Sequence, residues 1–128
     1  MKRFIIAVVT ILVMLSAGCE QTVADVTNEE LLDRLNGPHE SLVVLDVRSP
    51  DEFATGHVPG AINIPHDVLA SRLHELHARN KAEFVVYCET GRRASKARKI
   101  LESDGFLRVS HLQGDMAQWR RDGLPIER

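Results

Sequence analysis

Short apolar runs alternate with amphipathic stretches from about residue 25 to the end of the chain. Residues 42–45 and 84–87 are apolar or aromatic at every position, which is typical of strands buried on both faces of a parallel sheet. Shorter apolar runs at residues 61–64 and 109–112 predict two further strands. Strands that alternate with helical stretches in this way predict an α/β domain.

Capping signals and apolar spacing predict helices between these strands. Thr27 and Glu30 have the spacing of a capping box, which predicts a helix through about residue 35. Ser49 followed by Pro50 is typical of a second helix start. Apolar residues at helical spacing predict three more helices, over about residues 67–78, from about residue 94 onward and over residues 115–121.

The composition is that of one ordinary globular domain. The chain has 128 residues, of which 44% are hydrophobic and 27% charged, and this is enough to bury one core. With 16 basic and 18 acidic side chains the formal net charge is −2, so the chain lacks the basic field that non-specific nucleic-acid binding requires, and we expect no nucleic-acid partner. Two cysteines, Cys19 and Cys88, are too few for a disulfide scaffold, so each needs its own explanation.

The first cysteine ends an N-terminal targeting segment. Lys2 and Arg3 precede an apolar run over residues 4–15, and small residues at 16–18 lead to Cys19. This order is typical of a secretory signal peptide. The run is about a dozen residues long, whereas a helix needs about 20 to span a bilayer, so a signal peptide is favoured over a permanent transmembrane anchor.

The small residues directly before Cys19 resemble the lipobox of bacterial lipoproteins, in which the cysteine is lipidated. The resemblance divides the chain into a signal peptide over residues 1–18, a short linker over residues 19–24 and a mature domain over residues 25–128. It also implies a lipid anchor on the periplasmic side of the cell envelope, with Glu20 favouring the outer membrane. Cleavage after Ala24, which would leave a soluble periplasmic protein, is the alternative.

The second cysteine lies between a predicted strand and a predicted helix. Cys88 directly follows residues 84–87, at the carboxyl end of the sheet, where open α/β folds bind ligands. A short loop containing Gly91 can direct several backbone N–H groups at one point, and the following helix adds the positive end of its dipole. Both effects favour a thiolate at Cys88. The alternative is that Cys88 serves as a small buried hydrophobe.

The predicted helix after this loop begins with an excess of positive charge. Cations oppose the helix dipole there, which indicates that the loop receives a negatively charged ligand or intermediate. We expect Arg93, at the end of the loop, to contact that ligand, and Glu89 to turn outward. The remaining cations, except for Arg92 in the loop, are expected to form a solvated face: Lys96, Arg98 and Lys99.

Three segments carry a common resemblance. The first comprises LDVR at residues 45–48 and GHVPGAINIP at residues 56–65, the second is CETGRRAS at residues 88–95, and the third is GDMAQW at residues 114–119 with GLPI at residues 123–126. Together, and in this order, they resemble the rhodanese family from about residue 25 to the end of the chain.

This resemblance implies a fold and an activity. The fold is an α/β domain whose five-stranded parallel sheet is flanked by helices on both faces. The activity is that of a thiosulfate sulfurtransferase, in which Cys88 takes sulfane sulfur as a persulfide and passes it to cyanide or another thiophilic acceptor. No cofactor is implied, and a monomer is expected. The alternative is a persulfide carrier or sulfur-binding module that serves a partner protein without turnover.

The resemblance also assigns residues around Cys88. The loop that would hold the substrate and the persulfide comprises Glu89, Thr90, Gly91, Arg92 and Arg93. Three further residues are expected to brace the site, namely Asp46, Arg48 and Glu52, with Arg48 and Glu52 paired.

Two other chemistries are less well supported. The phosphatase pattern of cysteine, five residues and arginine would need arginine at position 94, where the chain has Ala94. His66, His74 and His77 could suggest a metal. His74 and His77 lack the cysteine or carboxylate pattern of a zinc site, however, so these two are expected at the surface, and no metal is expected.

Overall fold

A computed structural model describes residues 25–39 and 41–128. The predicted signal peptide, the linker and the lipidation site at Cys19 lie outside these residues, as does the alternative cleavage site after Ala24. Within the described part of the chain, no helix combines the length and the apolar character that crossing a bilayer requires.

The centre of the fold is a parallel sheet with the strand order β2-β1-β3-β4. The two inner strands, β1 (Leu42–Asp46) and β3 (Glu83–Tyr87), come from the two apolar runs, and four of the five residues in each are buried. The outer strands are the short β2 (Ile62–Asn63) and β4 (Val109–His111). The prediction that the apolar runs form the buried centre of a parallel sheet is therefore confirmed.

The expected five-stranded sheet was wrong, because the described sheet has four strands. Beyond β4, Val26 forms one isolated parallel bridge with Leu112. The next residue, Thr27, already caps a helix: its side chain accepts from the N–H of Glu30 while the Glu30 carboxylate accepts from the N–H of Thr27. Pairing on this side of Val26 therefore ends after one residue.

Four of the five predicted helices occur close to their predicted positions. They are α1 (Asn28–Asn36), α2 (Pro50–Thr55), α4 (Arg92–Ser103) and α5 (Asp115–Arg121). The start of α2 is a second capping box, formed by Ser49 and Glu52. This fixes the Glu52 backbone in the first turn of α2 and holds its carboxylate beside the Ser49 N–H.

The single helix predicted over residues 67–78 is instead broken into α3 (Leu69–Arg72) and two 3-10 turns, η1 (Leu73–Glu75) and η2 (His77–Arg79). No side chain caps the first of these elements at Val68. The apolar pattern still serves its purpose, because Leu69 and Leu76 are both buried. A tighter turn can bury the same residues, so the pattern predicted the buried face correctly and the helix type wrongly.

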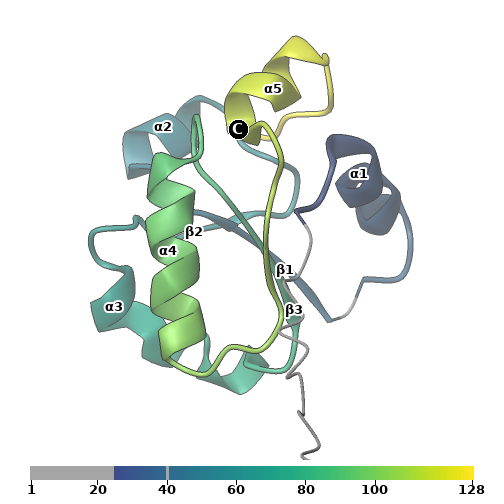
Figure 1. Cartoon of the computed structure of the whole chain (residues 1–128). Coiled ribbons are helices and arrows are strands. Elements are labelled where there is room, and N and C mark those ends of the chain that lie inside the picture. Colours follow the sequence, from purple (N-terminus) through teal and green to yellow (C-terminus); the bar gives the residue numbers. More distant parts are fainter. Residues whose placement is uncertain (1–24, 40) are drawn as a thin grey trace, which may run out of the picture.

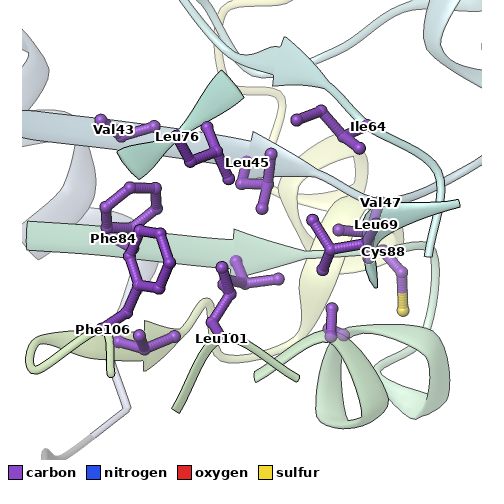
Figure 2. Close-up of a cluster of buried hydrophobic side chains, with 14 residues drawn as sticks. Val43, Leu45, Val47, Ile64, Leu69, Leu76, Phe84, Cys88, Leu101 and Phe106 are labelled. Carbon is purple, nitrogen blue, oxygen red and sulfur yellow. The ribbon is translucent and has the colours of Figure 1, made fainter. Parts of the chain in front are cut away.

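Successive residues of the inner strands point to opposite faces of the sheet, and each face has its own core. Val43 and Phe84 pack with residues of α3 and α4, whereas Val44 and Val85 pack with residues of α1 and α5 (Figure 1). Figure 2 shows the first of these clusters, which includes Cys88, the second residue after Val86 of β3. Because burying one such apolar side chain contributes roughly 1.5–3 kcal/mol, these two layers hold the carboxyl edge of the sheet in place.

Candidate active site

Cys88 begins the turn that joins β3 to α4. Cys88 is 1% exposed, and its Sγ accepts a hydrogen bond of 3.0 Å from the N–H of Gly91. Gly91 is the N-cap of α4 and has a φ of +116°, a conformation that residues with a side chain rarely adopt. One loop amide and the start of a helix of 12 residues therefore face the sulfur, an arrangement that stabilises a negative charge on it.

Arg48 lies fully buried behind the loop. Its Nη2 donates to Asp46 Oδ2 at 2.7 Å and to the Gly56 carbonyl at 2.7 Å, and its side chain is 0% exposed. Burial alone would lower the pKa of Arg48, but the hydrogen bond and the charge of Asp46 raise it overall. The expected pairing of Arg48 with Glu52 was wrong, because Asp46 lies two residues away at the same strand end and takes the guanidinium.

Glu52 pairs instead with Arg93 at the start of α4. The two side chains form a bidentate pair, with Nη1 to Oε1 at 2.6 Å and Nη2 to Oε2 at 2.9 Å. The Arg93 hydrogen bond lowers the pKa of Glu52 to about 2, and burial only partly opposes it. This pair links α2 to α4, so Glu52 braces the loop by holding Arg93. A ligand contact for Arg93 stays a prediction.

A third ion pair lies on the other side of the loop. The Glu89 carboxylate accepts from both Nη atoms of Arg120 at 2.6 Å, and Arg48 approaches it at 3.4 Å. Glu89 is half-buried between these two guanidinium groups, and the hydrogen bond from Arg120 lowers its pKa. The expectation that Glu89 turns outward was therefore wrong, because its carboxylate forms an ion pair with Arg120 of α5.

Two residues that sequence reasoning missed, His111 and Asp115, complete the surroundings of Cys88. Asp115 Oδ1 accepts from the Cys88 N–H at 3.0 Å, lies 2.8 Å from His111 Nε2 and is 3.7 Å from Cys88 Sγ. One signal was available: residues 113–115 follow a predicted strand at the same sheet edge that drew attention to Cys88. The contact of Asp115 with Cys88, 27 positions away, could not be predicted from the pattern.

The remaining cations of the loop and of α4 divide into two groups. Arg92, Lys96 and Lys99 are exposed, as is Thr90. Arg98, which was expected in the solvated face, is half-buried instead and forms ion pairs with Asp25 and Glu102. Arg92, the first residue of α4, is therefore exposed to solvent at the end of the loop.

A hollow of about 440 Å³ opens beside Arg93. Its walls come from the start of α2, the end of β2, the segment after β2 and the start of α4, and they include Ser49, Pro50, Asn63, Pro65, Val68 and Arg93. It therefore lies at the carboxyl edge of the sheet, where Cys88 also lies. No group of three histidine, cysteine or acidic side chains suited to a metal occurs within residues 25–39 and 41–128.

A parallel sheet with a buried cysteine at its carboxyl edge, in a short loop closed by glycine at a helix start, defines an α/β domain with a candidate site at the cysteine. The particular family follows from comparison with known proteins. A family model described as the rhodanese-like domain matches residues 27–122, and the chain belongs to this family. The family resemblance of the three sequence segments is thereby confirmed.

Curated relatives and solved structures agree with this assignment. The sulfurtransferase of Allochromatium vinosum is 34% identical over 104 residues, 81% of this chain and 94% of that protein. The thiosulfate:glutathione sulfurtransferase of Saccharomyces cerevisiae is 32% identical over 106 residues, 73% of this chain and 76% of that protein. The crystal structure of a rhodanese-related protein from Thermoplasma volcanium has 26% identity and a TM-score of 0.70, covering 81% of this chain and 97% of that chain.

The chain spans 44%, 42% and 51% of the length of three other curated relatives. Rhodanese-like domains therefore also occur within longer proteins. What the family and the sulfurtransferase relatives support for this chain is sulfur transfer as a class of chemistry.

Proposed function

We propose that the chain is a thiosulfate sulfurtransferase that works through a persulfide on Cys88. The observation that carries this proposal is the 3.0 Å hydrogen bond from the Gly91 N–H to Cys88 Sγ. A thiolate is the nucleophile that the reaction needs, and an amide donor at this sulfur favours the anion. The name of the yeast relative, thiosulfate:glutathione sulfurtransferase, supports thiosulfate as the donor for this chain.

The reaction has two displacement steps. The Cys88 thiolate attacks the outer sulfur of thiosulfate, a new S–S bond forms, and sulfite leaves with the electron pair of the old one. A thiophilic acceptor then attacks the terminal sulfur of the persulfide, and Cys88 leaves as a thiolate. A preorganised amide and helix start stabilise the negative sulfur at both stages without reorganising.

The hollow beside Arg93 is the proposed approach for the donor and the acceptor. It has polar groups from Ser49 and Asn63, apolar surface from Pro65 and Val68, and the Arg93 guanidinium at its edge. Exposed Arg92 adds a positive charge at the start of α4. Arg93 is already paired with Glu52, so the attraction for a dianionic donor would come mainly from Arg92.

The test measures thiocyanate produced from thiosulfate and cyanide by the whole chain. We expect activity in the wild type, none in Cys88→Ser, and unchanged activity in the matched control Cys19→Ser, which removes the other cysteine. A wild type no more active than Cys88→Ser would overturn the enzyme proposal.

A persulfide carrier is the second candidate, and the charge balance of the site favours it. Arg48, Arg93 and Arg120 each face a carboxylate, which reduces the attraction of the loop for a small dianion. Mass spectrometry after incubation with thiosulfate separates the candidates. One added sulfur on Cys88 without thiocyanate formation identifies a carrier, and no added sulfur contradicts the thiosulfate enzyme.

We also propose that Cys19 is lipidated and anchors the domain on the periplasmic side of the envelope. The support is the order of charged, apolar and small residues before Cys19. Cys19→Ala should leave an uncleaved or mis-sorted precursor. A mature N-terminus at Asp25 in the wild-type protein would instead establish cleavage after Ala24 and a soluble periplasmic protein.

A further inference from the structure

Asp115 combines burial, a positive φ and proximity to the sulfur of Cys88. It is 1% exposed, it has a φ of +55°, and its Oδ1 lies 3.7 Å from the sulfur of Cys88. Among the described residues, it is the one residue other than glycine with a positive φ. An unfavourable backbone conformation that is kept beside a reacting atom is a reason to look for a function.

The position of Asp115 beside the sulfur presents an electrostatic problem. A buried carboxylate repels a thiolate or a persulfide anion, and repulsion at this distance is strong where solvent is excluded. A buried carboxylate also requires a positive partner of its own. In the described part of the chain, Asp115 forms an ion pair with His111, whose Nε2 lies 2.8 Å from Asp115 Oδ1.

His111 is held in place for this contact. It is the last residue of β4, where it lies opposite Val86 of β3, and its carbonyl accepts from the Val26 N–H at 2.9 Å. Its side chain is 22% exposed, so it can exchange protons with solvent. The hydrogen bond that His111 donates to Asp115 raises the pKa of His111, although burial opposes the shift.

The other charged groups that face this pair are few. Asp25, before the Val26 bridge, favours protonated His111, whereas Arg98 of α4 disfavours it. Arg93 of α4 interacts with the charge of Cys88 but is itself held by Glu52. His111 is therefore the titratable cation in direct contact with the carboxylate that touches the sulfur.

We propose that His111, acting through Asp115, is a positioning residue for Cys88: protonated His111 compensates the buried carboxylate and so permits an anionic sulfur beside it. On ionisation the thiol proton leaves to solvent and the electron pair stays on Sγ. Without the positive charge of His111, the thiolate would form next to an uncompensated carboxylate. The inference deepens the proposed function, since it rests on Cys88 being the reacting sulfur.

The test measures the rate at which iodoacetamide alkylates Cys88 across pH, in the whole chain carrying Cys19→Ser so that Cys88 is its sole thiol. His111→Gln removes the charge while keeping a hydrogen-bond donor. We expect it to slow alkylation near neutral pH by about tenfold, as a shift of one unit in the ionisation midpoint would do. The profile should move to higher pH. The matched control His74→Gln, at an exposed position of η1, should leave the profile unchanged.

A double-mutant cycle then tests whether His111 acts through Asp115. Asp115→Asn keeps an oxygen for the Cys88 N–H and removes the charge, so His111→Gln should change the rate by less than about twofold in that background. A wild-type profile in His111→Gln, or an equal shift in both backgrounds, would overturn the proposal. Alkylation needs no sulfur donor, so these outcomes are distinct from failure to turn over thiosulfate.

A second measurement covers the case in which a variant does not fold. Coupling between two titrating groups is reciprocal, so removing the thiolate must change the titration of His111. We expect the NMR titration of His111 to have a lower midpoint in Cys88→Ser than in the chain with reduced Cys88. Equal midpoints would contradict the proposal.

Discussion

Gly91 faces Asp115 with little room for a side chain between them: a β-carbon placed on Gly91 would be 3.1 Å from Asp115 Oδ2. The same glycine has a φ of +116° and donates its N–H to Cys88 Sγ. The conformation of the loop therefore requires glycine at position 91.

Gly91→Ala should displace the loop and impair the chemistry of Cys88. A positive φ costs a residue with a β-carbon about 1–2 kcal/mol, and the contact with Asp115 adds to this. We expect sulfur transfer to fall by at least about tenfold, because small displacements of reacting groups are costly. Gly60→Ala is the matched control: Gly60 has a φ of +76° with nothing within 4 Å of its added carbon. Equal activity losses in both variants would contradict this account.

Arg48→Met should destabilise the fold strongly. It leaves Asp46 buried at 0% exposure without its cation, and breaking a buried pair by removing one partner costs about 3–5 kcal/mol. Arg120→Met, which breaks the half-exposed pair with Glu89, should cost less than about 1 kcal/mol. Urea unfolding at neutral pH measures both free energies. Similar losses would mean that burial of the Arg48 pair is not what matters.

The Glu52 and Arg93 pair should make stability fall in acid. Because the folded pKa of Glu52 is about 2 and its ordinary value is 4.5, the contribution is present above about pH 4.5 and is lost as the pH falls toward about 2. The pair is partly solvated, with 28% and 35% of its side chains exposed, so we expect less than about 1 kcal/mol. Glu52→Gln should lose less stability than wild type over this range.

The control for Glu52→Gln is Asp51→Asn, which removes the neighbouring exposed carboxylate of α2 and leaves the Arg93 pair intact. Its unfolding free energy should follow that of wild type between about pH 5 and pH 2.5. If Glu52→Gln also follows wild type, Glu52 is not the group that titrates.

His111 should have the opposite effect on stability. Its folded pKa is raised above the ordinary value of 6.5, chiefly by the hydrogen bond to Asp115. The contribution is therefore complete below about pH 6.5 and is lost as the pH rises through the folded value. In a Cys88→Ser background, where no thiolate forms, adding His111→Gln should flatten the decline in unfolding free energy between about pH 6 and pH 9. Parallel curves would show that His111 does not contribute.

The sequence predicted those features that depend on local signals. The inner strands follow from the uninterrupted apolar runs at residues 42–45 and 84–87, and the start of α2 from Ser49 with Pro50. The position of Cys88 follows from the rule that parallel strands end at one edge. By contrast, the stretch over residues 67–78 shows that an apolar pattern selects a buried face without selecting the helix type.

Contacts between distant parts of the chain could not be predicted in the same way. The sequence offers both Arg48 and Arg93 as partners for Glu52. The pairing with Arg93 depends on how α2 packs against α4. The contact of Asp115 with Cys88 depends on the entry of the chain into α5 at a positive φ. A single sequence contains the residues of such pairs but not the packing that brings them together.

The first turn of α5 is also joined to the loop by its backbone. The N–H of Met116 donates to the Cys88 carbonyl at 3.0 Å, and the N–H of Ala117 donates to the Glu89 carbonyl at 3.1 Å. Opening the last helix would therefore release the loop, so the two should exchange their amide hydrogens as one cooperative unit although 27 residues separate Cys88 from Asp115. Any event that unfolds the first turn of α5, including cleavage by a protease, would then displace the loop and reduce the reactivity of Cys88, although Cys88 itself is unchanged.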